Sequence, residues 1–307
     1  MLPIFLGIFL IWLYVRKFTP AQLNEIAYNI KNANYYWILL SLFFGILSHL
    51  SRAYRWHFML EPLGYKPKFT NSVMAVLIAY LLNLVIPRSG EVARAATMTK
   101  YEHIPFEKAF GTIVAERISD IIMLLIILSI VFFFQTDLIL GYFSNVNPLR
   151  KIGIIIVLLM LVTISIKLIK KSKHPFFVKI RKFIQGLIEG VSSIFKMKQK
   201  WAFIFHTIFI WSMYIAMFWA VTFTISETSH LSFEAILVGF IAGAIAMSIT
   251  NGGFGAYPVF VASALSLYGV PQEAGASFGL LMWISQTIMV LLFGGLSFVF
   301  LPIYNNK

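Results

Sequence analysis

The stretch KLIKKSKHPFFVKIRKFIQGLIEGVSSIFKMKQK, residues 167–200, determines how the fold of this chain is divided and oriented. It carries ten basic residues against one acidic residue, Glu189, in a sequence that is otherwise almost continuously apolar. Short loops rich in Lys and Arg stay on the cytoplasmic side of a membrane. We therefore predict that residues 168–200 form a cytoplasmic, basic, amphipathic linker between two halves of one membrane domain, residues 1–307.

The composition places the chain among polytopic helical membrane proteins. Of its 307 residues, 59% are hydrophobic and 12% are charged, which is far from the balance of a soluble domain. Runs of roughly 20 apolar residues can cross a hydrocarbon core of about 30 Å. The clearest such runs are residues 37–59, 109–134, 152–167, 201–225 and 279–300. We read residues 2–15 as a further, short spanning helix, because no basic segment or small-residue cleavage site marks a signal peptide.

The charged and reactive residue types exclude several classes of function. Most of the net charge of +13 lies in residues 167–200, which favours attraction to anionic headgroups at the cytoplasmic leaflet over binding of nucleic acid. The chain has no cysteine, so disulfides, thiolate nucleophiles and cysteine-based metal sites are excluded. Its six histidines lack the spacing of known metal motifs. We expect neither a metal nor another cofactor.

Two apolar stretches are interrupted by helix-breaking residues. Residues 69–86 end in P-R-S-G-E (87–91) before a second, shorter apolar segment and a proline-marked turn. Residues 233–249 end in T-N-G-G-F-G (250–255) and lead into the same sequence of features. This pattern is typical of a re-entrant helical hairpin, whose tip is tolerated at membrane depth only where it is buried or lines a cavity.

The two hairpins belong to a weak internal repeat with an offset of 166 residues. I-P-F-E-K-A at 104–109 aligns with V-P-Q-E-A-G at 270–275, and R-I-S-D at 117–120 aligns with W-I-S-Q at 283–286. A chance alignment of two apolar segments is the alternative. With the basic linker inside, both termini are predicted to be cytoplasmic and residues 137–148 and 227–232 external, so the hairpins enter from opposite faces.

The predicted fold class is an all-α polytopic membrane protein with about six spanning helices plus two re-entrant helical hairpins in an inverted repeat. The first repeat covers residues 35–135 and the second covers residues 201–301. Inverted repeats whose broken helices meet near the midplane are the architecture of alternating-access transporters. We therefore expect the hairpin tips, residues 87–90 and 251–255, to approach each other.

Three motifs carry a resemblance to a known family. P-R-S-G-E-V-A-R (87–94), E-R-I-S-D (116–120) and N-G-G-F-G (251–255) resemble the membrane domain of bacterial lysyl-phosphatidylglycerol synthase/flippase proteins and their stand-alone flippase-like relatives. The resemblance covers about residues 37–300. It implies a protein of the bacterial cytoplasmic (inner) membrane that handles phosphate-bearing lipids, either aminoacylated phosphatidylglycerol or polyprenyl-phosphate carriers. The aminoacyl-transferase domain is absent, so lysyl transfer is not implied.

A phosphate headgroup that crosses the bilayer needs hydrogen-bond donors and positive charge. Half-helices that begin at the breakers would direct free N–H groups and positive dipole ends toward the centre, and glycines let the backbone approach an anion closely. Arginine offers the planar fork suited to phosphate. The candidate substrate-binding residues are Arg52, Arg55, Arg88, Glu91, Arg94, Glu116, Arg117, Asp120, Asn251, Gly252, Gly253 and Gly255.

Each candidate also has a structural interpretation. The glycine-rich turn can serve close packing of the hairpin tips. Glu116, Arg117 and Asp120 can form a bracing charge cluster, while Arg52 and Arg55 can extend to the membrane interface. In the functional interpretation one water-accessible cavity is lined by Arg88, Arg94 and Arg117 together with Glu91, Glu116 and Asp120. The arginines there contact phosphate and one of the carboxylates takes up a proton, while Arg52 and Arg55 guide the headgroup into the cavity.

The leading hypothesis is a flippase or transporter that moves an anionic, phosphate-bearing lipid between leaflets, with proton coupling as an option. An intramembrane enzyme that modifies a lipid headgroup is the first alternative, but no cysteine, metal motif or Ser–base pair supplies a nucleophile. A non-catalytic membrane partner of a lipid-modifying enzyme is the second. The sequence specifies neither the lipid nor the oligomeric state.

Overall fold

The computed structural model describes residues 2–135, 160, 174–178, 180–181 and 197–306. These residues form helices joined by short turns, and none of them is in a strand. The chain divides into two units, of which the first contains residues 1–116 and 198–307 and the second contains residues 117–197. The first unit holds both helical hairpins and a cluster of buried charged residues.

Four helices of the described residues are long and apolar enough to cross a membrane. They are α3 with its 3-10 extension η1 (Tyr35–Leu63), α6 (Phe106–Phe134), α10 (Lys200–Thr222) and α13 (Gln272–Asn305). The all-α polytopic membrane fold is thus confirmed, and four of the expected spans coincide with these helices. The fifth expected span, residues 152–167, and most of the basic linker lie outside the described residues.

The N-terminal segment differs from the expected spanning helix. Helix α1 (Leu2–Val15) has 14 residues, which is about 21 Å and too short to cross a hydrocarbon core. A Cβ atom on Gly255 would lie 2.1 Å from the carbonyl oxygen of Gly7, so α1 packs directly on the tip of the second hairpin. A second helix, α2 (Pro20–Lys31), comes next and begins with a capping box formed by Thr19 and Gln22.

Two series of helices recur along the chain. The first is α3 (Tyr35–Leu60), α4 (Phe69–Val85), α5 (Ser89–Glu102) and α6, and the second is α10, α11 (Phe233–Ile249), α12 (Ala256–Ser266) and α13. Helix α13 begins 166 residues after α6, and α10 begins 165 residues after α3. The element boundaries therefore agree with the offset of the weak sequence repeat.

The first helices of the two series, α3 and α10, run in opposite directions. The Ser51 hydroxyl bonds to His206 Nδ1 at 2.8 Å, and the Ser41 hydroxyl donates to the Met217 carbonyl at 3.0 Å. From Ser51 back to Ser41 on α3 the residue numbers fall, whereas those of the partners on α10 rise from 206 to 217. The two helices are therefore antiparallel. An antiparallel relation between equivalent helices is the property of an inverted repeat.

In each hairpin the two helices are separated at glycine residues, and in the first hairpin also at Pro87. In the first hairpin, the backbone N–H of Gly90 donates to Asn83 Oδ1 at 2.8 Å. A Cβ atom at Gly90 would lie 2.1 Å from the Ala79 carbonyl oxygen, so α4 and α5 cross at backbone contact. In the second hairpin, the 3-10 turn η3 (Asn251–Gly253) joins α11 to α12, with Gly252 in the left-handed region at φ 57°.

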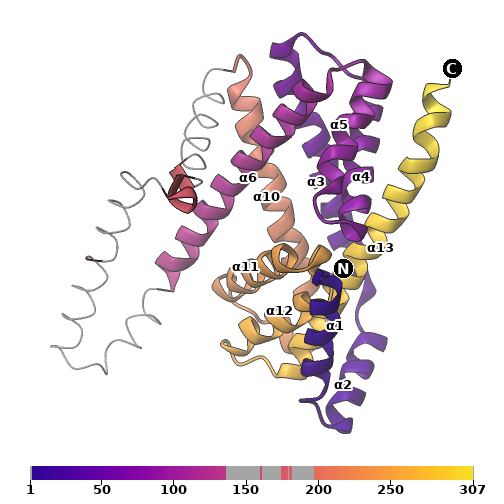
Figure 1. Cartoon of the computed structure of the whole chain (residues 1–307). Helices are drawn as coiled ribbons and strands as arrows, with labels where there is room; N and C mark the ends of the chain where they lie inside the picture. Colours follow the sequence, from indigo (N-terminus) through magenta and orange to yellow (C-terminus); the bar gives the residue numbers. More distant parts are fainter. Residues whose placement is uncertain (1, 136–159, 161–173, 179, 182–196, 307) are drawn as a thin grey trace. The chain divides into compact units, whose positions relative to one another are not determined.

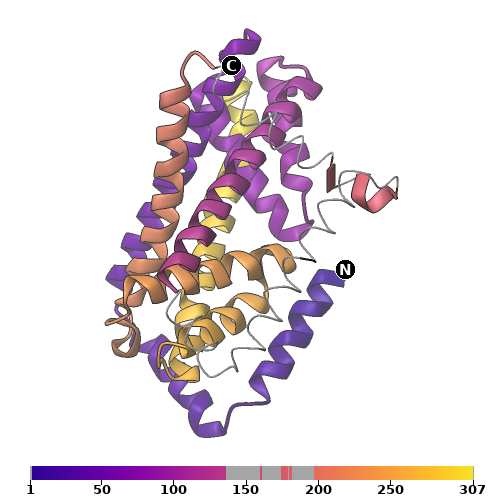
Figure 2. The same ribbon diagram turned by 90° about the vertical axis from the view of Figure 1, so that its left-hand side faces the viewer.

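The end of α4, just before the first breaker, meets the tip of the second hairpin. Asn251 Nδ2 donates to the Val85 carbonyl at 3.4 Å, and these two positions are equivalent at the offset of 166. A Cβ atom at Gly252 would lie 2.6 Å from Leu84 Cδ2. Figures 1 and 2 show α4 and α5 toward one end of the long helices α3, α10 and α13, and α11 and α12 toward the other.

The apolar core of the first unit is built mainly by the second series. Phe218 on α10, Val261 on α12 and Phe278 on α13 are completely buried in one cluster with Tyr257. The rings of Phe218 and Phe278 pack edge-to-face with centroids 4.8 Å apart, a favourable geometry for aromatic pairs. Helices α10–α13 are therefore held together by side-chain packing.

Replacing Gly90 by Ala is expected to destabilise the protein by about 2–3 kcal/mol, because the new methyl group must separate α4 from α5. Gly111→Ala is the matched control, since a Cβ atom on Gly111 meets nothing within 4 Å. Denaturant-induced unfolding in detergent micelles gives the free energy of unfolding of both variants. Equal stabilities of the two variants would contradict the close crossing.

A buried arginine–glutamate cluster as the candidate site

Helix α3 carries the first part of the site on one face. Arg52 and Arg55 are three residues apart and therefore neighbours on the helix surface. Their side chains are 4% and 0% exposed, so the alternative that they extend to the membrane interface is wrong. Burying a guanidinium group in an apolar protein is costly unless it is paired and hydrogen-bonded.

The partner of both arginines is Glu116 on α6. Its Oε1 atom lies 2.5 Å from Arg52 Nη1 and 3.2 Å from Arg55 Nη2. Its Oε2 atom lies 3.0 Å from Nη2 of Arg94, which comes from α5 in the first hairpin. The Glu116 and Arg94 side chains are 2% and 5% exposed. Three guanidinium groups from two helices thus contact one buried carboxylate; we name these four residues the arginine–glutamate cluster.

Aromatic and hydroxyl groups fix the direction of Arg94 and Arg55. The Arg94 guanidinium lies 3.8 Å from the centroid of the Trp56 ring, within the range of a cation–π interaction. Trp56 is held in turn, because its indole N–H donates to Thr112 Oγ1 at 2.8 Å. Arg55 Nη1 donates to Thr207 Oγ1 at 3.0 Å, which ties the cluster to α10.

A chain of hydroxyl groups extends from Arg52. Its Nη2 atom donates to the Tyr214 hydroxyl at 3.3 Å, and this hydroxyl lies 3.1 Å from that of Tyr80 on α4. The Tyr80 ring packs against His49, with ring centroids 4.4 Å apart. Helix α4 of the first hairpin is therefore connected to the cluster through polar side chains.

The charge of the cluster has no counterpart in the second repeat. Its four side chains carry three positive charges and one negative charge. At the offset of 166, the equivalent positions are Phe218, Val221, Phe260 and Met282, which belong to or pack against the apolar core. The same place in the fold is thus a charged cluster in one repeat and a hydrophobic core in the other.

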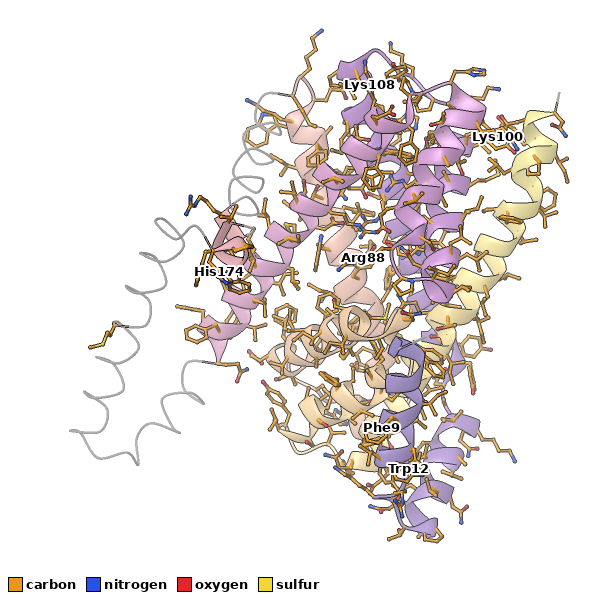
Figure 3. All side chains as sticks on the ribbon, viewed as in Figure 1. Phe9, Trp12, Arg88, Lys100, Lys108 and His174 are labelled. Carbon is orange, nitrogen blue, oxygen red and sulfur yellow. The ribbon has the colours of Figure 1, made fainter. Side chains whose placement is uncertain are left out.

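The first hairpin brings Arg94 into the cluster and leaves Arg88 outside it. Arg88 is exposed at the hairpin tip and adopts a left-handed backbone conformation at φ 64°. Figure 3 places it at mid-height, between Lys100 and Lys108 at one end and Phe9 and Trp12 at the other. Arg88 and Arg94, which were expected to line one cavity, therefore lie in different surroundings, one exposed and the other buried against Glu116.

The remaining charged candidates have other described contacts. Glu91 accepts a hydrogen bond from Asn83 Nδ2 at 3.4 Å, within the first hairpin. Arg117 Nη1 lies 3.9 Å from Asp120 Oδ2 on the same helix, and the Arg117 side chain is 45% exposed. Arg117 and Asp120 belong to the second unit. In the described part of the chain, no group of three or more His, Asp or Glu residues could hold a metal.

The glycine-rich turn makes packing contacts. Gly252 faces Leu84, Gly255 faces Gly7, and Gly253 faces Met247 of its own hairpin. The Gly252 carbonyl accepts a hydrogen bond from the Trp283 indole at 2.7 Å. In each of these contacts a glycine lets two segments approach closely, which is the packing role that the structural interpretation gives to the turn.

Sequence reasoning did not identify the aromatic and hydroxyl side chains around the arginines. Trp56 lies four residues after Arg52 on α3, and this helical spacing was the available signal. Thr207 and Tyr214 come from α10 and Tyr80 from α4, at sequence distances that local spacing does not connect.

Comparison with known proteins identifies the family of the chain. A family model described as the lysylphosphatidylglycerol synthase TM region matches residues 1–294, and the chain belongs to this family. It is 26% identical to a UPF0104 membrane protein of Methanocaldococcus jannaschii over 89% of this chain and 87% of that protein. A UPF0104 membrane protein of Pyrococcus horikoshii is 26% identical over 42% of this chain and 40% of its own length. No solved structure matches the chain with significance.

Glu116→Gln is expected to lower the free energy of unfolding by about 3–5 kcal/mol, because removing one partner of a buried ion pair leaves the others uncompensated. The matched control is Glu107→Gln, which changes an exposed carboxylate at the start of the same helix and should act within about 0.5 kcal/mol. Denaturant-induced unfolding in detergent micelles gives the free energy of unfolding of the two variants. If Glu116→Gln is as stable as the control, the ion pairs do not hold the fold.

Proposed function

We propose that this member of the lysylphosphatidylglycerol synthase transmembrane-region family moves an anionic, phosphate-bearing lipid between the two leaflets of its membrane. The observation that carries the proposal is the buried arginine–glutamate cluster, in which Arg52, Arg55 and Arg94 converge on Glu116. The family itself links the chain to a membrane and to lipid handling. The proposal adds that the arginines bind the lipid phosphate and that this binding is a step of its passage.

A phosphate group is a suitable ligand for these arginines. Guanidinium groups bind phosphate and carboxylate oxygens through the same forked N–H geometry. In the absence of a lipid, Glu116 holds the three donors toward one point, so little side-chain entropy is lost when phosphate oxygens approach that point. The positive charge in excess of Glu116 favours an anion over a neutral headgroup.

The position of the cluster suits a lipid that enters from one leaflet. Arg94 lies five residues after the start of α5 at Ser89 and six residues before Lys100, so it is about 8 Å from the tip and about 9 Å from the Lys100 end of the hairpin. A headgroup that moved from the cluster toward the tip would next meet the positive dipole end of α5 and the exposed Arg88. The hairpin thus offers a series of positive groups along the length of α5.

The contacts of Glu116 argue against acid–base chemistry at this cluster. A general base must lie within hydrogen-bond reach of the proton that it abstracts. The groups that contact Glu116 are guanidinium groups, which stay protonated in proteins. A headgroup-modifying enzyme and a non-catalytic partner of such an enzyme are therefore treated as alternative outcomes of the test.

The test is lipid exchange in proteoliposomes that contain fluorescent phosphatidylglycerol or, separately, a fluorescent polyprenyl phosphate. A membrane-impermeant quencher reads the outer leaflet. Arg94→Gln should slow exchange about 10- to 100-fold, because a hydrogen bond to a charged group contributes about 1.5–3 kcal/mol. Arg94→Lys should slow it less, since the charge remains while the fork is lost.

Lys100→Gln is the matched control, because it removes an exposed charge from the same helix and should leave the rate unchanged. Mass spectrometry of the extracted lipids identifies the alternatives. A new lipid species would indicate an enzyme, and neither exchange nor a new species would indicate a partner protein. Equal rates of lipid exchange for Arg94→Gln and Lys100→Gln would show that the cluster takes no part in transport.

A further inference from the structure

A buried histidine lies beside the arginine–glutamate cluster without being one of its four members. His49 is on α3, one turn before Arg52, and is 4% exposed. Its Nδ1 atom has no hydrogen-bond partner among the described residues. Two other histidines of the membrane helices differ in this respect, because His57 and His206 each bond to a serine hydroxyl.

Few titratable or charged groups of the described residues face His49. On α3 the charged neighbour is Arg52, and on α4 the titratable neighbour is Tyr80, whose ring centroid lies 4.4 Å from that of the imidazole. Through Tyr80, His49 is connected to the Tyr214 hydroxyl on α10 and from there to Arg52. Helix α13 contributes apolar residues to this environment, among them Met289 and Phe293.

A small cavity lies beside the imidazole. Its volume is about 30 Å³, and His49 is the polar side chain in a lining that also includes Leu77 and Val290. This volume exceeds the roughly 10–15 Å³ that one water molecule requires. A protonated imidazole has two N–H donors, and the cavity gives the second donor room for a water partner.

We propose that His49 is the proton-binding site that couples lipid movement to a proton gradient. The proposal rests on the proposed function. His49 takes up one proton when a lipid phosphate occupies the arginine–glutamate cluster and releases it when the phosphate leaves. While the cluster holds no phosphate, its excess positive charge repels an imidazolium one helical turn away. The negative charge of the phosphate weakens this repulsion, so the two ligands favour each other's binding by the same factor.

The geometry favours His49 over the carboxylate of the cluster as the proton carrier. Protonating Glu116 would break its contacts with three buried guanidinium groups, which would then be left buried without that counter-charge. Protonating His49 breaks no hydrogen bond at Nδ1, because that atom makes none with the described residues. The proton therefore adds to the site without dismantling it.

The test uses the full chain in phosphatidylcholine vesicles that contain fluorescent phosphatidylglycerol, with the membrane potential clamped and a pH difference of one unit. One proton per lipid should enrich the probe about tenfold in the leaflet that faces the alkaline side, because tenfold corresponds to the free energy of one pH unit. His49→Gln should still exchange the lipid but leave it evenly distributed. The pH dependence of exchange should flatten in the same variant.

His57→Gln is the matched control, because it changes a serine-bonded histidine two turns further along α3 and should keep the tenfold enrichment. His49→Asn and protein-free vesicles complete the set. Exchange by the parent protein without enrichment refutes the coupling while the proposed function stands; no exchange refutes both. Enrichment that persists in His49→Gln overturns the proposal, as does loss of exchange in both folded His49 variants, which would place His49 in the passage itself.

Discussion

The structure depends on how three buried guanidinium groups are paired with one carboxylate inside an apolar helical protein. A charge moved from water into such an interior is tolerated only when opposite charge and hydrogen bonds replace the solvent. Glu116 supplies that charge to Arg52, Arg55 and Arg94 at once. Because these residues come from α3, α5 and α6, the same contacts that give the arginines a counter-charge also fix the first hairpin against its neighbours.

Equivalent positions of the two repeats are occupied by chemically different side chains. Where the first repeat has the arginine–glutamate cluster, the second has Phe218, Val221 and Met282 in its buried core. Apolar packing offers an arriving anion nothing to bind. Ion pairs, in contrast, present donors that phosphate oxygens can share. The inverted repeat is therefore symmetric in its helices and asymmetric in its chemistry, which assigns the lipid phosphate to the first hairpin in our proposal.

Much of this fold could be predicted from the sequence, because breakers and charges act locally. P-R-S-G-E and T-N-G-G-F-G interrupt apolar runs, and the observed hairpins turn at these residues. Ionisable residues in spans are rare, and the candidates chosen from the sequence include Arg94 and Glu116, although they also include Arg88, Arg117 and Asp120, which lie outside the cluster. The convergence of Arg94 and Glu116 with Arg52 and Arg55 could not be derived, since it depends on the register of α3, α5 and α6. The segments that the glycines face, Leu84 for Gly252 and Gly7 for Gly255, could not be derived either, because they depend on tertiary packing.

Binding of a lipid phosphate by the arginine–glutamate cluster can be observed in an experimental structure of the protein in a lipid bilayer supplied with phosphatidylglycerol or a polyprenyl phosphate. We predict phosphate density within hydrogen-bond distance, about 3 Å, of guanidinium nitrogens of Arg52, Arg55 or Arg94, with those nitrogens shifted from Glu116. Phosphate density confined to Arg88 at the hairpin tip or to the exposed lysines, with the Glu116 contacts intact, would contradict binding of the lipid phosphate by the cluster.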